Sequence, residues 1–242
     1  MTAIRNILGF FLSLRTALWL LGIMLLLMFA GALIMPGRQE FQALHGTPLF
    51  SWLRTQPLSI TWWMWGLIGL LAVLAANTLF CSVESVLKKR KVTQWLLIIA
   101  PQVIHIGFLF VLLAHLMSAQ GARQSQAAVW EGSVVALPGS TMTLKVRDIN
   151  IILDYYGYIR DWEVDVEYLA AGKALHQDRI MPNNPSVRQG FNVTVKDLRA
   201  RPPQAVLLQI NREPGAAWAL AGGILFMIGI TTLVVLRIRM ER

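Results

Sequence analysis

The chain has 242 residues, of which 55% are hydrophobic and 14% are charged. A soluble domain carries about 25% charged residues, so this composition indicates a membrane protein. The net charge of +9 does not come from the long polar segment 119–215, where basic and acidic residues nearly balance, and this excludes a nucleic-acid-binding surface. The single cysteine, Cys81, excludes an internal disulfide and a CxxCH motif.

Four apolar segments are each long enough to span a bilayer as a helix, which takes about 20 residues. They cover residues 16–35, 60–80, 95–118 and 216–236. The apolar core of the first segment is longer than the ~7–15 residues of a secretory signal, so we expect a helix that is not cleaved off.

Basic residues flank these segments and predict the topology. The loop before the third segment reads Lys88-Lys89-Arg90-Lys91, and the positive-inside rule places it in the cytoplasm. The N-terminus and the RIRMER tail then also lie inside, and segments 37–59 and 119–215 lie outside. We therefore expect a membrane domain over 1–118, an extracytoplasmic domain over 119–215, and a fourth helix with a cytoplasmic tail over 216–242.

Tryptophans and glycines mark particular places on the expected helices. Trp52, Trp62, Trp63 and Trp65 gather near the outer end of the second helix, as in an interfacial aromatic belt, or as in a surface for a flat ligand or a partner helix. Glycines can let helices approach each other closely, and we expect this role at Gly31, Gly222, Gly223 and Gly229, either within this chain or against a partner.

The outer segment has the alternating pattern of β-strands. In DWEVDVEYL, the residues Trp162, Val164, Val166 and Tyr168 share one face, and Glu163, Asp165 and Glu167 share the other. Together with the neighbouring alternating stretches, this predicts a small antiparallel sheet or sandwich. The acidic row is most simply the solvated face of an exposed strand; a cation site or a docking patch for a basic cytochrome is the alternative.

Two histidines lie within the third apolar segment. His105 falls near its middle, and His115 lies ten residues further on, about 15 Å along a helix and roughly 80° around it, so the two cannot bind one metal ion. An ionisable residue at membrane depth indicates function, and neutral imidazole is a good axial ligand for haem iron. We therefore expect both histidines to contact a cofactor, with His105 as the iron ligand. His105 could instead pack or contact a quinone, for example with a hydrogen bond to Asn77, and His115 could have only a structural or interfacial role.

The order of these parts resembles the ResB (CcsB) family of cytochrome c biogenesis proteins, in a short form. The similarity lies in FFLSLRTALWLLG, in WWMWGLIGLLAVLAANTLFC, in HIGFLFVLLAHLMSAQGA, and in the outer pieces VWEGSVVALPG and MPNNPSVRQGFNVTV, followed by INREPGAAWALAGG. The resemblance implies a bacterial inner-membrane protein that acts with a ResC (CcsA)-like partner to deliver haem b to an apocytochrome c.

The resemblance also implies a site and its limits. His105 matches the third-helix histidine that contributes to the family's haem site, with the haem bound transiently or shared with the partner. The partner carries the tryptophan-rich WWD segment, which this chain lacks, so by itself the chain should not be an enzyme. The alternatives are a membrane anchor of a haem b- or quinone-linked electron-transfer complex, and an assembly factor without a cofactor.

Overall fold

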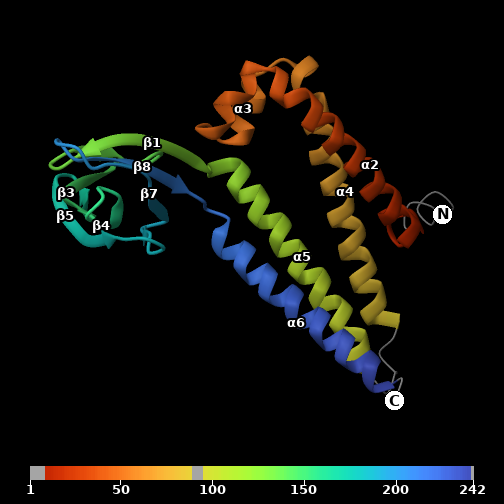
Figure 1. The fold of residues 1–242 in the computed structure, drawn as a ribbon. Helices are drawn as coiled ribbons and strands as arrows, with labels where there is room; N and C mark the ends of the chain where they lie inside the picture. The colour runs from red at the N-terminus through yellow and green to blue at the C-terminus, as the bar shows by residue number, and fades with distance from the viewer. Residues whose placement is uncertain (1–8, 89–94, 241–242) are drawn as a thin grey trace. The chain divides into compact units, whose positions relative to one another are not determined.

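The structure, a computed structural model, describes residues 9–88 and 95–240 (Figure 1). The chain forms two compact units, one helical and one a β domain made of Gln120–Pro214 together with Leu44–Leu49. Four helices of the first unit are long and apolar enough to cross a membrane. They are α2 (Leu14–Ile34), α4 (Leu58–Lys88), α5 (Trp95–Gly121) and α6 (Ala216–Met240).

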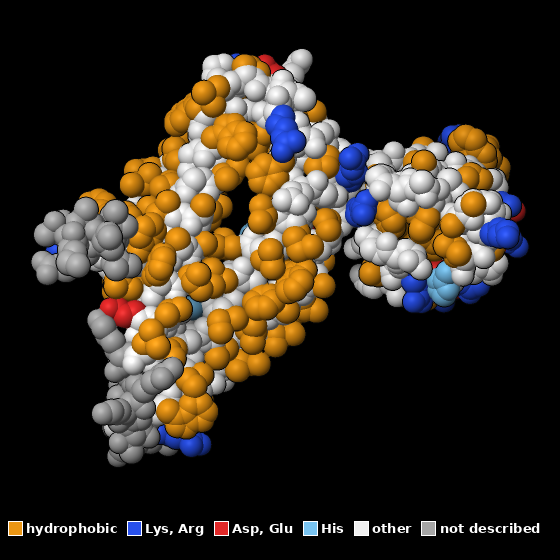
Figure 2. Space-filling model, turned by 180° about the vertical axis from the view of Figure 1, so that it is seen from behind, with side chains coloured by type: hydrophobic (Ala, Val, Ile, Leu, Met, Phe, Trp, Pro, Cys, Tyr) orange, Lys and Arg blue, Asp and Glu red, His pale blue; other side chains and the backbone are white. Residues whose placement is uncertain are grey.

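All four apolar segments predicted from the sequence form helices, but the second is longer than expected. α4 has 31 residues and continues to Lys88 instead of ending near residue 80. The added residues, Cys81–Lys88, contain no glycine or proline to stop the helix. Hydrophobic side chains cover the visible surface of the helical unit, as expected for contact with lipid (Figure 2).

Small residues hold α5 and α6 together in antiparallel register. Ala114 meets Gly215, Gly107 meets Gly222, and Ala100 meets Gly229, so each helix contributes a small residue every seventh position. A Cβ atom added to Gly222 would lie 2.7 Å from the carbonyl oxygen of Gly107. Close approach of the backbones is the usual means of packing helices in lipid.

Gly223 and Gly31 differ from the glycines that pack against a neighbouring helix backbone. A side chain on Gly223 would meet nothing within 4 Å, so Gly223 makes no close contact within the described part of this chain, and a contact with a partner there stays a prediction. Gly31 does lie in a close contact, but with the indole ring of Trp63 rather than with another backbone.

Connecting segments at one end of α2 and α4 enclose a small aromatic core. They comprise η1 (Met35–Gly37), η2 (Gln39–His45) and α3 (Leu49–Thr55). Trp52 and Trp63 are only 2% and 5% exposed, and both rings pack against Phe41. The interfacial-belt interpretation is therefore wrong for these two tryptophans, because their rings fill the core of the connection. Trp62 and Trp65 are exposed, as a belt requires.

The β domain is a sandwich of two four-stranded antiparallel sheets, in the orders β1-β8-β7-β6 and β2-β3-β4-β5. Val164, Val166 and Tyr168 point into the shared core as their alternation predicts, each at most 1% exposed. The strands are β1 (Arg123–Trp130), β2 (Val134–Ala136), β3 (Met142–Leu153), β4 (Ile159–Ala170), β5 (Lys173–Ile180), β6 (Ser186–Arg188), β7 (Phe191–Arg199) and β8 (Ala205–Arg212).

Candidate functional site

His105 joins two of the long helices. Its side chain projects from α5, and its Nδ1 lies 2.8 Å from the hydroxyl oxygen of Ser82 on α4. Asn77 does not contact it: the Asn77 amide donates to the carbonyl oxygen of Phe11 at 2.7 Å, where the helix before α2 ends. The suggested hydrogen bond between His105 and Asn77 is therefore wrong, because Asn77 caps a carbonyl that the break in the helix leaves open.

The Ser82 hydroxyl lies between two hydrogen-bonding groups, Nδ1 of His105 and the carbonyl oxygen of Thr78, which is 2.7 Å away and one turn earlier in α4. A hydroxyl has one proton to donate, and a carbonyl oxygen can only accept. When Ser82 donates to Thr78, its oxygen is left to accept from Nδ1 of a ring protonated there. A neutral ring protonated at Nδ1 has its lone pair on Nε2, which is the nitrogen left for a ligand.

His105 also lines a cavity of about 320 Å³ between α2, α4 and α5. Ligand sites in proteins range over about 300–1,000 Å³, so this cavity could accept a small ligand or one part of a larger one. Its walls are mainly apolar, and its polar groups come from α4 and α5. The lining residues are Leu12, Leu14, Ala17, Leu21, Leu74, Asn77, Thr78, Cys81, His105 and Phe108.

A complete metal site is not present in the part of the chain that the structure describes. Residues 9–88 and 95–240 contain no group of three His, Cys, Asp or Glu side chains that could hold a metal ion. His105 could therefore supply one bond, and other bonds would have to come from another molecule. His115 is exposed on α5, and it is not among the residues lining the described cavity.

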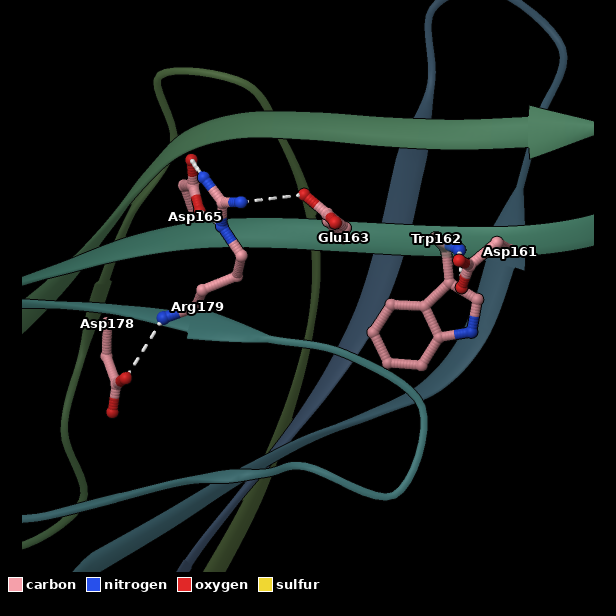
Figure 3. Close-up of polar contacts among 6 residues, drawn as sticks. All are labelled: Asp161, Trp162, Glu163, Asp165, Asp178 and Arg179. Atoms are coloured by element: carbon pink, nitrogen blue, oxygen red, sulfur yellow. Dashed lines mark hydrogen bonds and ion pairs between the residues drawn. The ribbon is translucent and has the colours of Figure 1, made fainter.

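The three carboxylates of the acidic row, Glu163, Asp165 and Glu167, form ion pairs with arginines of the β domain (Figure 3). Arg179 of β5 lies between two of its members, with 3.0 Å from Nη1 to Glu163 and 2.7 Å from Nε to Asp165. Glu167 accepts hydrogen bonds from Gln177 at 2.9 Å and from Arg147 at 3.2 Å. Two arginines therefore pair with the three carboxylates, which leaves a net charge of −1 (2 − 3) in the row and argues against a cation site there.

Electrostatics in this row follow from those contacts. The hydrogen bond from Gln177 lowers the pKa of Glu167; desolvation opposes the shift and Arg147 reinforces it. The two carboxylates beside Arg179 raise the pKa of its guanidinium, Asp165 through a hydrogen bond above all. Glu167 is only 6% exposed, so a fully solvated acidic face is wrong for this residue.

Sequence reasoning missed Ser82, and a signal for it existed. α4 and α5 are consecutive helices, so residues at similar distances from the intervening segment come to lie opposite each other if the helices pack antiparallel. Thr78 and Ser82 fall near the position opposite His105 by that count. Serine in an apolar helix usually bonds to its own backbone, so the hydroxyl alone did not indicate a site.

Fold and site together define a chain with four long apolar helices, a β-sandwich domain, and an imidazole facing an apolar cavity. No protein-family model matches the chain, and no curated protein matches it in sequence. Among solved structures it is similar to a protein described as Cytochrome c Heme Lyase CcmF, with a TM-score of 0.47 and 16% identity over 86% of this chain. The match covers 34% of that protein, so this chain spans about a third of its length.

Proposed function

We propose that this chain is a ResB-like membrane subunit of a cytochrome c maturation system, which holds haem b as cargo together with a ResC/CcsA-like partner. The observation that carries the proposal is the hydrogen bond between Ser82 and His105, because with Ser82 donating to Thr78 it would hold the proton on Nδ1 and leave Nε2 unprotonated. Histidines that bind metals commonly donate the other ring N–H to a neighbouring acceptor in this way.

The cavity beside His105 is better suited to a haem site that a partner subunit completes than to a haem site formed by this chain alone. Haem would bring an iron atom, for which neutral imidazole is a good axial ligand. Apolar side chains of α2 and α4 would exclude water from the imidazole face, and Asn77 is already engaged elsewhere. A volume of about 320 Å³ is small for a whole porphyrin, so the remaining wall and the second axial bond would come from the partner.

The proposed topology follows the basic residues. The N-terminus, the segment 88–91 and the C-terminal tail would lie in the cytoplasm, and the domain 119–215 would lie outside a bacterial inner membrane. There the β domain would contact an apocytochrome c or support the partner. His115 would be a second haem-contacting side chain, toward the outer end of α5 and about 15 Å along the helix from His105.

The test is the absorption spectrum of the complex purified through this chain, with the copurifying proteins identified by mass spectrometry. Among the copurifying proteins we expect one that bears a WWD segment. The absorption spectrum should show less than one haem per complex, and this haem should be lost in His105→Ala. Ser82→Ala should retain part of the haem with a shifted spectrum, because the ring loses its fixed orientation. Thr232→Ala is the control, since its hydroxyl also bonds one turn back, to Ile228, on a different helix.

Other spectra would favour other functions. One stable haem per complex that quinol reduces would identify an electron-transfer anchor. Unchanged cytochrome c maturation in His105→Ala, with no haem in any preparation, would identify an assembly factor without a cofactor. In either case the delivery proposal fails. His115→Ala, measured in the same way, tests the outer ligand separately.

A further inference from the structure

A two-stranded ribbon reaches beyond the rest of the second sheet of the β domain. β2 pairs with β3 only over residues 143–145, and β5 pairs with β4 only as far as Val164. Within residues 120–214, all of which the structure describes, segments 150–153 and 159–163 therefore have no strand partner except each other. We call residues 150–163 the tyrosine arm.

The tip of the tyrosine arm exposes large side chains in a defined shape. Tyr155, Tyr156 and Tyr158 are 97%, 81% and 73% exposed. The backbone N–H groups of Tyr156 and Tyr158 both donate to the Asp154 carboxylate, at 2.9 and 2.8 Å, and Gly157 adopts a φ of +85°. The turn is therefore held by its own hydrogen bonds, and the tyrosines are not needed to fold it.

The arm lies at the end of the sandwich opposite to where the chain enters and leaves the domain. The turn before β3 is fixed to β8 by a hydrogen bond of 2.7 Å from Arg212 to the carbonyl oxygen of Gly139. Arg212 pairs with Arg123, so β1 begins and β8 ends at this place. β3 runs away from it for 12 residues, roughly 36 Å at about 3.3 Å per step.

Core packing explains only one face of this ribbon, where Ile151 is buried and Trp162 packs against the core. A two-stranded hairpin is marginal by itself, and an open edge with apolar side chains is a template for pairing with another chain. The arm has a register shift between Ile152 and Leu153 and charged residues at Arg160, Asp161 and Glu163, which are features that proteins use to protect such edges, but apolar side chains remain exposed on it. Here Ile152, Leu153 and Ile159 are each more than 40% exposed beside the open edges.

We propose that the tyrosine arm is a docking site for an extended, positively charged segment of another polypeptide, which adds as a strand to an open edge. Unpaired backbone N–H and C=O groups match the backbone of a second strand. Tyrosines add a large, rigid contact area at low entropic cost, as they do in antibody loops. The arm contains one arginine and three carboxylates, a net charge of −2 (1 − 3); Glu163 is already paired with Arg179 outside the arm, and the remaining negative charge favours a basic partner.

Two other occupants are less well matched by the same charges. A second copy of the chain would bring two arms of like charge together. An anionic membrane surface attracts basic residues and would repel the carboxylates of the arm. Docking at the arm does not involve His105, so either proposal can fail while the other stands.

The test uses the full chain in phosphatidylcholine nanodiscs and a fluorescent peptide of about twelve residues that alternates valine and lysine. We expect binding by fluorescence anisotropy, and no binding of the matching valine–glutamate peptide. Replacing Tyr155, Tyr156 and Tyr158 together with serine should weaken binding at least about tenfold, as for residues at the centre of an interface. Asp161→Lys should weaken it as well, and Val187→Ser, an exposed apolar position on β6, should not.

A second peptide separates strand addition from charge attraction. N-methylation of alternate residues keeps the charge but removes the N–H groups of one edge, so this peptide should lose binding. Equal binding of the methylated peptide, or no effect of the tyrosine and Asp161 variants, overturns the proposal. Light scattering tests whether the occupant of the arm is a second copy of the chain. A wild-type chain that is dimeric and a tyrosine variant that is monomeric would assign the arm to that second copy.

Discussion

The contact between α5 and α6 yields a prediction in which neighbouring glycines respond oppositely to the same substitution. A Cβ atom on Gly222 would lie 2.7 Å from the carbonyl oxygen of Gly107 and 2.9 Å from Cγ2 of Val111. Ordinary contacts begin near 3.4 Å, so the two backbones would have to separate by about 0.7 Å (3.4 − 2.7). Forcing an extra carbon into a packed contact costs about 1–3 kcal/mol, and Gly222→Ala should destabilise the chain by that amount.

Gly223→Ala is the matched control on the same helix. Its added carbon would meet nothing within 4 Å, and alanine favours a helix over glycine by about 1 kcal/mol. We therefore expect Gly223→Ala to be neutral or stabilising. The two variants have the same composition, the same length and almost the same depth in the helix, so they differ only in what the new methyl group meets.

The stability of both variants is measured by unfolding the purified chain in mixtures of mild detergent and dodecyl sulfate. Circular dichroism follows the loss of structure. Gly107→Ala should behave like Gly222→Ala, because its added carbon would lie 2.7 Å from the Gly222 carbonyl oxygen. If Gly222→Ala and Gly223→Ala have the same stability, the α5–α6 contact described above does not exist in the folded protein. If only Gly107→Ala is destabilising, α5 packs there against something other than α6.

Three further predictions concern other contacts. Gly31→Ala should cost about 1–3 kcal/mol in the same unfolding assay because its methyl group meets the indole ring of Trp63, whereas Gly22→Ala should not; equal effects would contradict the packing of that indole. Asn77→Leu should cost about 1–3 kcal/mol, since a partly buried carbonyl loses its best donor, and an unchanged unfolding midpoint would show that the carbonyl is satisfied otherwise. Desolvation raises the pKa of Asp178, but hydrogen bonds outweigh it and the net shift is downward, so its contribution to stability is present above the ordinary value of 3.8 and is lost as the pH falls through the lower folded value. Thermal unfolding should accordingly depend less on acidic pH in Asp178→Asn, and an identical pH dependence would refute this assignment.

Periodicity predicted most of the fold because burial imposes it directly. Runs of about 20 apolar residues can only be accommodated as long helices, and alternation over Val164, Val166 and Tyr168 places one face of a strand in a core. The number of layers was not predictable in this way. Whether strands form one sheet or two depends on which strands pair, and pairing over long sequence separations leaves no local signal.

Glycine content alone did not distinguish Gly223 from its neighbour Gly222, whereas the spacing of small residues would have done so. Ala100, Gly107 and Ala114 recur every seven residues on α5, and Gly215, Gly222 and Gly229 recur every seven residues from the position just before α6. Residues seven apart return to nearly the same face of a helix, so this repeat distinguishes contact positions from Gly223, which lies about 100° away from Gly222. The tryptophans were misjudged for a related reason, because an interfacial ring and a ring buried under a connecting segment have the same sequence signature.

The same contact between helices explains why His105 faces where it does. Gly107 faces α6, and His105 precedes it by two residues, or about 200° around the helix, so its ring points away from α6. That direction leads to α4, where the Ser82 hydroxyl oxygen lies 2.8 Å from Nδ1, and to the cavity. The orientation of the imidazole therefore depends on small residues that never touch it. Under the proposed function, any displacement of α5 caused by Gly222→Ala should reduce haem retention together with stability, whereas Gly223→Ala should reduce neither. Haem loss in both variants alike would show that the orientation of His105 is set by something other than the α5–α6 contact.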